Sequence, residues 1–476
     1  MNLNKFLNEE DSYKYYIVKM LETKSNVFLS ENHLIELLGL SKYKFEKFIK
    51  NIEEDGKFLK IPISIKIEIS GEIVVKGIDN LAVKKLRLYY LENSRQYKIL
   101  WELLVGKSIN SDNLPTKLFL SRSSFYNELR ELKKNLKEYQ ISITNLKLSG
   151  EELSIRVFLF TLFNEFYNGI SLPFSEGIIK KVNRFKQILL LREHIYPTKI
   201  QEYKLDLFLG IVFMRMAKNR YLSISVSDTD IDKEKLSSYL NVFNNKKKKR
   251  EQIIELTNIF FFCYTEGLLD NLESENFNLF VDNEVKNITR NFFAVLKETF
   301  SFDLFDVKWL EKEIIRINRK WLFFHFRSST FIFENQKSYF QEIYPKLDQL
   351  IRNFLTSSEY KSYFQSEEER TKVYYDYLFL LVTILPIELL EDVIYICVDF
   401  SHGNFYNEFI KRSISSFQNL NVKFERKLTT KTQIYISDFV LNKNVCPQII
   451  WKNPPGPNDW KVFGDLVVSL KEGSYE

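Results

Sequence analysis

The sequence is poor in the residues on which many enzymes and secreted proteins depend. Its 476 residues include 14 glycines, 10 prolines, 3 cysteines and 4 histidines. The three cysteines (Cys263, Cys397 and Cys446) are widely separated and odd in number, which predicts a reducing, cytoplasmic environment rather than a disulfide framework or a zinc knuckle. Walker, G-x-G-x-x-G, H-E-x-x-H and paired-cysteine motifs are all missing. We therefore expect no catalytic site, no cofactor and no metal.

Long apolar runs are also missing. The longest, Tyr377–Leu385, ends at Pro386 and is too short to span a bilayer. The first residues, MNLNKFLNEED, are polar and acidic, unlike a signal peptide. With 45% hydrophobic and 27% charged residues, the composition is typical of a folded, soluble chain. The missing apolar runs predict no association with a membrane. The length predicts about three to five domains.

The positive charge is concentrated near the N-terminus. Residues 1–150 hold 25 Lys and Arg against 19 Asp and Glu, whereas the remaining 326 residues hold 43 of each. This excess favours a polyanionic partner for the N-terminal region. The lysine run at Asn244–Arg250 is interpreted instead as a solvated loop between helices.

The first 80 residues predict a winged helix-turn-helix. Apolar residues at helical spacing mark a helix over Asp11–Leu21, and Ser30 and Ser41 are placed to cap two more helices. Isoleucine then alternates through Ile61–Ile69, and after Gly71 an apolar run completes a hairpin. Three helices followed by a hairpin are the order of a winged helix-turn-helix.

The same order returns 80 residues later, centred on Leu118–Leu136. Leu40-Ser41 corresponds to Leu120-Ser121, and the apolar stripe of the third helix is repeated in register. The matched pairs are Phe45 with Phe125, Ile49 with Leu129, and Ile52 with Leu132. Pro115 falls inside the expected second helix of this copy, so that helix is predicted to be short or to start late. A second wing is expected from Ile141 to Gly150.

The two third helices carry the residues that we expect to contact nucleic acid. In the second copy the polar face offers guanidinium, amide and hydroxyl groups, which can bind phosphates and base edges. These residues are Arg122, Ser123, Ser124, Tyr126, Asn127 and Arg130. The first copy presents Lys42, Tyr43, Lys44 and Lys47, a lysine-rich set that is suited mainly to phosphate contacts.

After Gly150 the pattern is helical for about 235 residues and then changes to short strands. The predicted helical segments include Asn283–Thr299, Trp309–Phe326 and Gln336–Leu355. Residues 393–398 form an all-apolar run typical of a buried parallel strand, and further strands are expected over 422–424, 433–439 and 448–451. We predict a mainly helical, multidomain chain with a C-terminal α/β domain, and Val467-Val468 as a possible closing strand. The predicted domains are a first winged helix-turn-helix at 1–80, a second at 81–168, helical bundles at 169–280 and 281–388, and the α/β domain at 389–476.

This order, together with the Gly150–Leu159 segment (GEE-x3-R-x-F-L), resembles the Mga/AtxA class of virulence transcription regulators. The resemblance implies that the bundles are PRD-like domains, regulated by the sugar phosphotransferase system, and that the C-terminal domain is EIIB-like. It further implies a cytoplasmic, DNA-binding transcription regulator, usually an activator. Implied partners are double-stranded DNA, phosphocarrier proteins and a second copy of the chain, bound through the EIIB-like domain.

In PRD domains the regulatory event is phosphorylation of histidine, which adds negative charge. The candidates here are His325 and His194, and Arg327 lies near the first of them to pair with a phosphate. The segment of the first bundle most like a PRD histidine helix, Phe208–Arg220, contains no histidine. This departure puts classical control of the first bundle in doubt.

Two other functions remain as alternatives. A PRD-containing RNA antiterminator also joins a nucleic-acid module to two bundles, although its module would be β-rich. An EIIB-like phosphocarrier would need a cysteine just after its first strand, but Cys397 is expected inside that strand, and Ser401-His402 occupies the loop. We interpret the C-terminal domain as structural.

Overall fold

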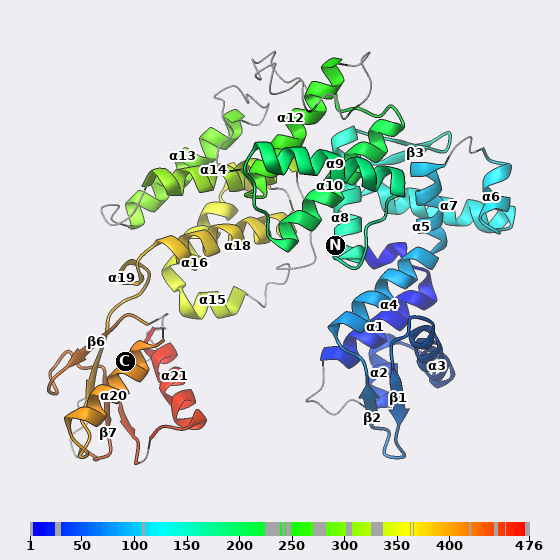
Figure 1. Ribbon diagram of the computed structural model, residues 1–476. Helices are drawn as coiled ribbons and strands as arrows, with labels where there is room; N and C mark the ends of the chain where they lie inside the picture. The colour runs from blue at the N-terminus through cyan, green and yellow to red at the C-terminus, as the bar shows by residue number, and fades with distance from the viewer. Residues whose placement is uncertain are drawn as a thin grey trace. The chain divides into compact units, whose positions relative to one another are not determined.

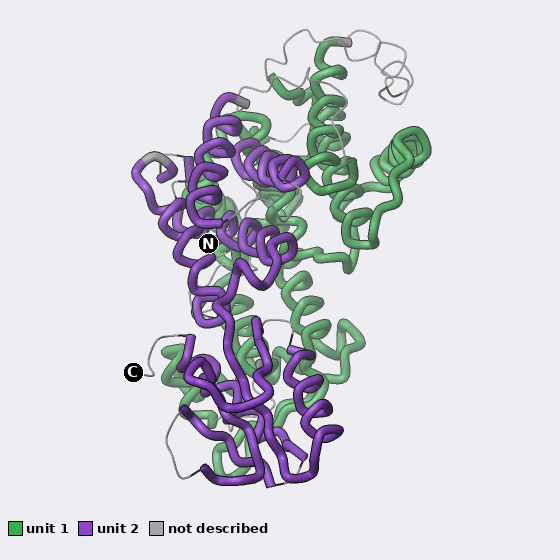
Figure 2. Tube along the Cα trace, turned by 90° about the vertical axis from the view of Figure 1, so that its left-hand side faces the viewer, with its two compact units in different colours: residues 1–280, 324–329 green, residues 281–323, 330–476 purple. Residues whose placement is uncertain are grey.

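The computed structural model groups the chain into two compact units, one of residues 1–280 with 324–329 and one of residues 281–323 with 330–476 (Figure 2). The residues described are 3–23, 30–106, 110–223, 239, 243, 249–269, 282–300, 307–324, 337–361, 363–364, 366–417, 420–441, 446–452 and 454–471. Within these ranges no helix combines the length and the apolar character needed to cross a membrane.

The first unit opens with two helix–hairpin modules (Figure 1). The first module comprises α1 (Glu9–Thr23), α2 (Glu31–Leu38), α3 (Lys42–Phe58), β1 (Ser64–Ile67) and β2 (Ile73–Lys76). The second comprises α5 (Arg95–Val105), α6 (Asn113–Lys117), α7 (Arg122–Lys137), β3 (Ser142–Thr144) and β4 (Lys147–Ser149). In each module the two strands pair in antiparallel fashion. The order of elements predicted from the sequence is therefore present twice.

The repeat extends to individual hydrogen bonds. Ser41 Oγ accepts from the Lys44 amide at the start of α3, and Ser121 Oγ accepts from the Ser124 amide at the start of α7. Both serines have extended backbone, as helix caps require. The turn before each cap is also repeated, because the amide of Leu40 donates to the Ile35 carbonyl and that of Leu120 to the Pro115 carbonyl.

The repeated turn requires a left-handed backbone at one position. Gly39 meets this need in the first module with φ of 61°. Phe119, 80 residues later, adopts φ of 55° although left-handed backbone is unfavourable for a residue with a Cβ. The Phe119 side chain is 97% exposed, so it lies outside the core. The second module thus keeps the turn geometry without the glycine that would favour it.

The position of Pro115 agrees with the prediction that the second helix of this copy is short. Helix α6 begins at Asn113 and has five residues. Pro115 therefore lies in the first turn, where a backbone N–H has no partner within the helix and none is lost.

A helix that the sequence patterns did not predict, α4 (Asn80–Asn93), connects the two modules. Asp79 caps it by accepting from the Ala82 amide, and it packs against α1, α5 and α8 (Glu152–Tyr167). Its Arg87 donates to Asn4 Oδ1 and to Glu165 Oε1, the latter at 2.6 Å. The short helix η1 (Leu3–Phe6), which contains Asn4, also packs against α7. The chain start is therefore attached to the second module.

The first unit continues with helices α8, α9 (Glu176–Arg192), α10 (Lys199–Ala217) and α12 (Lys249–Thr265). A buried charge network ties three of them together. Arg156 of α8 donates to both carboxylate oxygens of Glu255 on α12, at 2.5 and 2.8 Å. Glu152 of α8 binds Arg156 and also Arg215 of α10. Each charge is paired, which offsets the large cost of its desolvation.

In the second unit, α13 (Asp282–Thr299) and α14 (Val307–Phe324) follow the predicted segments. The prediction of a single helix over 336–355 is wrong, because this segment forms two helices: α15 (Lys337–Ile343) ends before α16 (Pro345–Thr356) begins. Pro345 disfavours helical backbone at the residue before it, and Tyr344 has φ of −126° and ψ of 62°. Helices α17 (Ser358–Lys361), α18 (Glu367–Ile384) and α19 (Ile387–Leu390) complete this part.

The C-terminal part is a four-stranded parallel sheet in the order β6-β5-β7-β8. Its elements are β5 (Ile394–Val398), α20 (Asn404–Ser415), β6 (Val422–Glu425), β7 (Ile434–Ser437), β8 (Gln448–Ile450) and α21 (Pro457–Lys471). The prediction that Val467-Val468 forms a closing strand is wrong, because both residues lie in helix α21. Phe463 and Val467, one helical turn apart, are buried in the core of this part.

Candidate nucleic-acid interface

The helix α7 buries one face and exposes the other. Phe125, Leu129, Leu132 and Leu136 form the buried stripe, and all of them are at most 6% exposed. Five of the six predicted contact residues are exposed, and Ser124 is half-buried. The exposed five are Arg122, Ser123, Tyr126, Asn127 and Arg130. A helix fixed by its apolar face and capped at Ser121 can present these side chains in a defined geometry.

The two arginines of this face have only weak partners within the chain. Arg122 Nη2 lies 3.3 Å from Asp112 Oδ1, and both side chains are at least three-quarters exposed. Arg130 Nη2 donates to Asn127 Oδ1 over 3.2 Å. Exposed contacts of this kind contribute about 0–1 kcal/mol each. Both guanidinium groups therefore remain available to a phosphate or a base at little cost.

The corresponding face of α3 is more engaged within its own module. Lys42 Nζ lies 3.3 Å from Glu31 Oε2, and Lys47 Nζ lies 3.0 Å from Glu10 Oε1. Tyr43 is 77% exposed, and Lys44 is also exposed. The Glu31 side chain is only 7% exposed, so Lys42 could bind a phosphate only by leaving a buried carboxylate without this partner. The Lys47–Glu10 pair is exposed on both sides and contributes as little as the arginine contacts of α7. Lys42 is therefore less available to an anion than the α7 arginines.

The charge counts separate the modules in the same way. Residues 1–80 hold 12 Lys and Arg against 13 Asp and Glu, whereas residues 81–150 hold 13 against 6. The N-terminal charge excess therefore belongs to the part that contains the second module. A polyanion would be attracted mainly to that module.

The sequence patterns predicted the hairpins but did not single out their tips. At the first tip Ile69 is fully exposed. At the second, Asn145 and Leu146 have φ of 50° and 54°, the backbone of a type I′ turn, and the exposed Lys147 follows. Such tips are additional candidates for contact with a nucleic-acid backbone. The signal available from sequence was a lysine directly after a two-residue turn.

The regulatory candidates differ in how they are placed. His194 is exposed and follows the end of α9 with φ of 51°. Glu193 beside it accepts a hydrogen bond from the Tyr239 hydroxyl at 2.8 Å. His325, with Arg327, lies outside the described residues.

Cys397 lies inside β5 and is 2% exposed, as the alternation of the sequence predicted. Burial raises the pKa of its thiol to about 11, so the nucleophilic thiolate is disfavoured near neutral pH. In the loop after β5, both the amide and the hydroxyl of Ser401 donate to Asp438, which lowers the pKa of that carboxyl. In the described part of the chain no cluster of three or more His, Cys, Asp or Glu side chains is arranged to hold a metal.

Comparison with known proteins gives a match to a helix-turn-helix domain family and a relative described as a regulator. Residues 79–163 match the Mga helix-turn-helix domain, a range that contains α4, the second module and most of α8. A relative from Streptococcus pneumoniae serotype 4, described as a "Putative trans-acting regulator", is 21% identical over 167 residues. That similarity covers 34% of this chain and 34% of the relative, so it spans about a third of the relative's length.

Proposed function

Because the chain carries a helix-turn-helix domain of the Mga type, as its sequence pattern predicted, we propose that it is a DNA-binding transcription regulator that uses α7 as its recognition helix. The observation that carries the proposal is the exposed face of α7, with two arginines and an amide on a capped, packed helix. Arginine and asparagine can form paired hydrogen bonds with guanine and adenine in the major groove.

The two modules would divide the work unequally. Arg122 and Asn127 have side chains able to distinguish bases, whereas Arg130, Ser123, Ser124 and Tyr126 are suited to the phosphate backbone. In the first module, Lys44 and Tyr43 are the exposed groups, and Lys42 and Lys47 would first have to leave their carboxylate partners. We therefore assign base preference to the second module and supporting phosphate contacts to the first.

Gel shifts with duplex DNA and with RNA at two salt concentrations test this function. Duplexes would first be selected from a random pool by the full-length protein. We expect the selected duplex to bind more tightly than RNA of the same sequence, with an affinity that falls steeply as salt rises. Equal or tighter binding of RNA would instead support the antiterminator alternative.

We further propose that residues 169–280 and 281–388 are PRD-like bundles whose state depends on the phosphotransferase system, and that the protein acts as an activator. The exposure of His194 supports access by a phosphocarrier protein. A phosphohistidine assay with purified phosphocarrier, comparing the wild type with His194→Ala and His325→Ala, tests the link. Equal labelling of all three proteins would contradict it.

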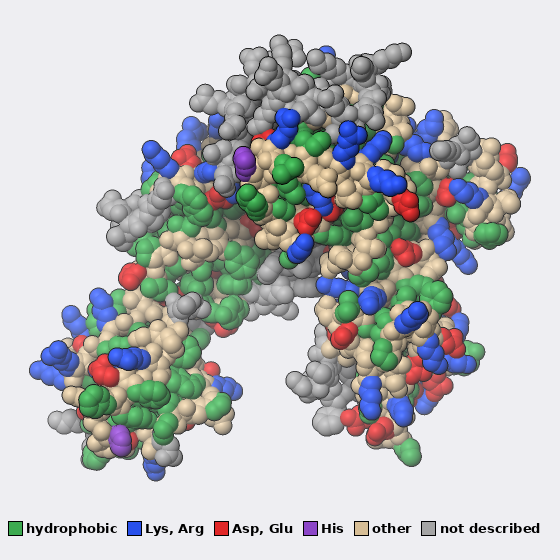
Figure 3. All heavy atoms as spheres, in the orientation of Figure 1, with side chains coloured by type: hydrophobic (Ala, Val, Ile, Leu, Met, Phe, Trp, Pro, Cys, Tyr) green, Lys and Arg blue, Asp and Glu red, His purple; other side chains and the backbone are tan. Residues whose placement is uncertain are grey.

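The EIIB-like C-terminal domain is proposed to join two copies of the chain. Hydrophobic side chains gather on the visible face of this part (Figure 3). The exposed ones near the Ser401–Asp438 contact are Phe405, Phe409, Phe439 and Val440, with Phe405 95% exposed. Exposed apolar patches are typical of protein interfaces. The buried position of Cys397 argues against the alternative of a phosphocarrier.

Phe405→Glu is expected to dissociate this dimer, since it places a charge in an apolar interface. The measurement is the mass in solution by light scattering across a range of protein concentrations. Val462→Glu, at a residue of α21 that is 57% exposed, provides a matched control and should leave the dimer intact. A Phe405→Glu protein that still has the mass of a dimer at low concentration would exclude this surface.

A further inference from the structure

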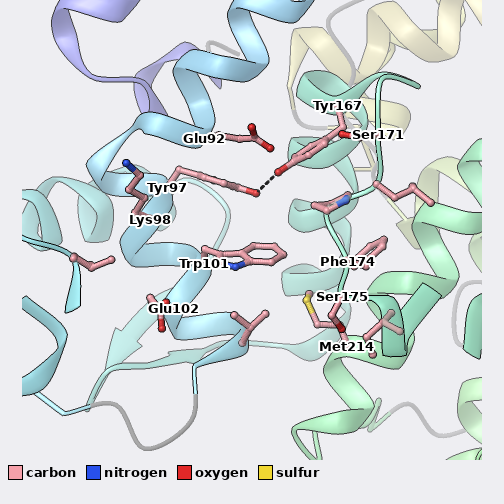
Figure 4. Close-up of a pocket in the computed structure, with 15 residues that line it drawn as sticks. Glu92, Tyr97, Lys98, Trp101, Glu102, Tyr167, Ser171, Phe174, Ser175 and Met214 are labelled. Carbon is pink, nitrogen blue, oxygen red and sulfur yellow. Dashed lines mark hydrogen bonds between the residues drawn. The ribbon is translucent and has the colours of Figure 1, made fainter. Parts of the chain in front are cut away.

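A cleft of about 750 Å³ lies within the first unit, with α5 on one side and the segment between α8 and α9 on the other (Figure 4). Pockets of about 300–1,000 Å³ are typical of small-molecule sites. The cleft has one wall from the Mga-type domain and one from residues beyond it, namely Ser171–Ser175 and Met214 of α10. None of the functions proposed above uses it.

The middle of the cleft is apolar and aromatic. Trp101 of α5 extends across it toward Phe174 and Met214 (Figure 4). The indole packs against the Tyr97 ring, with centroids 6.1 Å apart, and in edge-to-face geometry against the Phe163 ring at 6.2 Å. Since Trp101 is only half-buried, part of this ring remains open to the cleft. A flat, apolar group is the natural occupant of such a surface.

One end of the cleft is polar and carries a negative charge. The hydroxyls of Tyr97 and Tyr167 lie 2.8 Å apart, and the exposed Glu92 side chain also lines this end (Figure 4). Burial raises the pKa of both tyrosines, so both hydroxyls keep their protons. This end of the cleft therefore offers two neutral phenol hydroxyls and, beside them, an exposed carboxylate.

The other charged residues of the lining do not cancel this charge. The Lys98 ammonium is directed away from Trp101 and Glu92 (Figure 4). Glu102 is paired with Lys117 at 2.6 Å, outside the aromatic part of the cleft. Of the charged lining residues, Glu92 is thus the one whose carboxylate lies on the side of the two tyrosine hydroxyls (Figure 4).

We propose that this cleft binds a small amphipathic amine. Its apolar, ring-containing body would lie between Trp101 and Phe174, and its protonated amine would bind the Glu92 carboxylate and the neighbouring hydroxyls. Aromatic faces also attract a nearby cation, so Trp101 and Tyr97 add to the preference for positive charge. A neutral molecule of the same shape would keep the apolar contacts and lose the charged ones.

The position of the cleft makes the ligand a regulator of DNA binding, a consequence that rests on the proposed function. Helix α5 packs against α7, so a ligand that joins α5 to the 171–175 segment acts directly beside the recognition helix. A ligand shifts the affinity for DNA when it favours one arrangement of these walls over another.

Calorimetric titration of the full-length protein with 2-phenylethylamine tests the site, with 2-phenylethanol and phenylacetate as the neutral and anionic counterparts. We expect one amine per chain with a dissociation constant of about 1 mM or lower, and at least tenfold weaker binding of the alcohol and of the anion. Glu92→Gln should abolish the advantage of the amine over the alcohol. Glu102→Gln, which removes one carboxylate from α5 whereas Glu92 belongs to α4, should preserve it.

Three results would overturn the proposal: no heat of binding with the amine, equal binding of the amine and phenylacetate, or unchanged amine binding in Glu92→Gln. Gel shifts with the selected duplex, with and without the amine, test the regulatory consequence separately. Amine binding that leaves the affinity for the duplex unchanged would overturn that consequence alone. A failure to bind any duplex would contradict the proposed function and not the amine site.

Discussion

The Arg122→Ala, Arg130→Ala double variant is expected to lose most of its affinity for the selected duplex. Each arginine contact with a base or phosphate is worth about 1–3 kcal/mol, so the two together should cost about 2–6 kcal/mol. Both side chains are exposed and hold only weak internal contacts, so the fold should be unaffected. The measurement is a gel-shift titration at constant salt.

A matched control separates local contacts from net charge. Lys180→Ala, Arg184→Ala removes two exposed charges from α9, and it lowers the net charge by the same amount. This control should bind nearly as well as the wild type, apart from a small loss of general attraction. Wild-type affinity in the α7 double variant would exclude α7 as the recognition helix.

The single variants Arg122→Ala and Asn127→Ala should change the base preference, whereas the double variant should mainly lose affinity. If these side chains bind base edges, each loss should relax the base preference at one position by about 1–3 kcal/mol. Repeating the duplex selection with each variant would show this as a degenerate position. An unchanged selected sequence would instead assign the residue to the phosphate backbone.

The second large effect is expected at the buried charge network of α8, α10 and α12. Glu255 is fully buried and accepts two hydrogen bonds from Arg156 and one from the Leu222 amide. Glu255→Gln keeps the shape but leaves the Arg156 charge without its main partner. Breaking a buried pair in this way costs about 3–5 kcal/mol of unfolding free energy.

Hydrogen exchange of α8 and α12 during denaturant titration is the appropriate measurement, because the chain has more than one unit and need not unfold in one step. Glu131→Gln provides a control, since its contact with Lys134 is exposed and 3.8 Å long. It should cost less than about 1 kcal/mol. A similar loss of unfolding free energy in Glu255→Gln and Glu131→Gln would show that the buried network is no more stabilising than an exposed ion pair.

Much of the fold follows from short-range patterns. Ser41 and Ser121 could be identified as caps because a cap needs only a hydroxyl three residues before an amide. The apolar stripes of α3 and α7 follow from the helical period, and the 80-residue offset makes each copy support the other. The strands of the C-terminal sheet were predicted in the same way, from short apolar runs.

Other features depended on packing and were not predictable from such patterns. Helix α4 packs against several other helices, and its apolar residues do not form a single stripe. Lys42 is engaged while the α7 arginines stay available, because the buried Glu31 carboxylate approaches it from α2. The end of α15 before Pro345 and the helical state of Val467 likewise reflect local sterics and burial that outweigh the apparent period.

The sequence by itself determined two modules of helices and a hairpin, the exposed polar face of α7 and a small parallel sheet, because caps and periodicity act over a few residues. Only the tertiary structure decided which charges are paired. Arg156 and Glu255 are 99 residues apart, and no local pattern relates them. The same holds for the Trp101 cleft, whose walls come from segments about 70 residues apart and meet only when α5 packs beside α8.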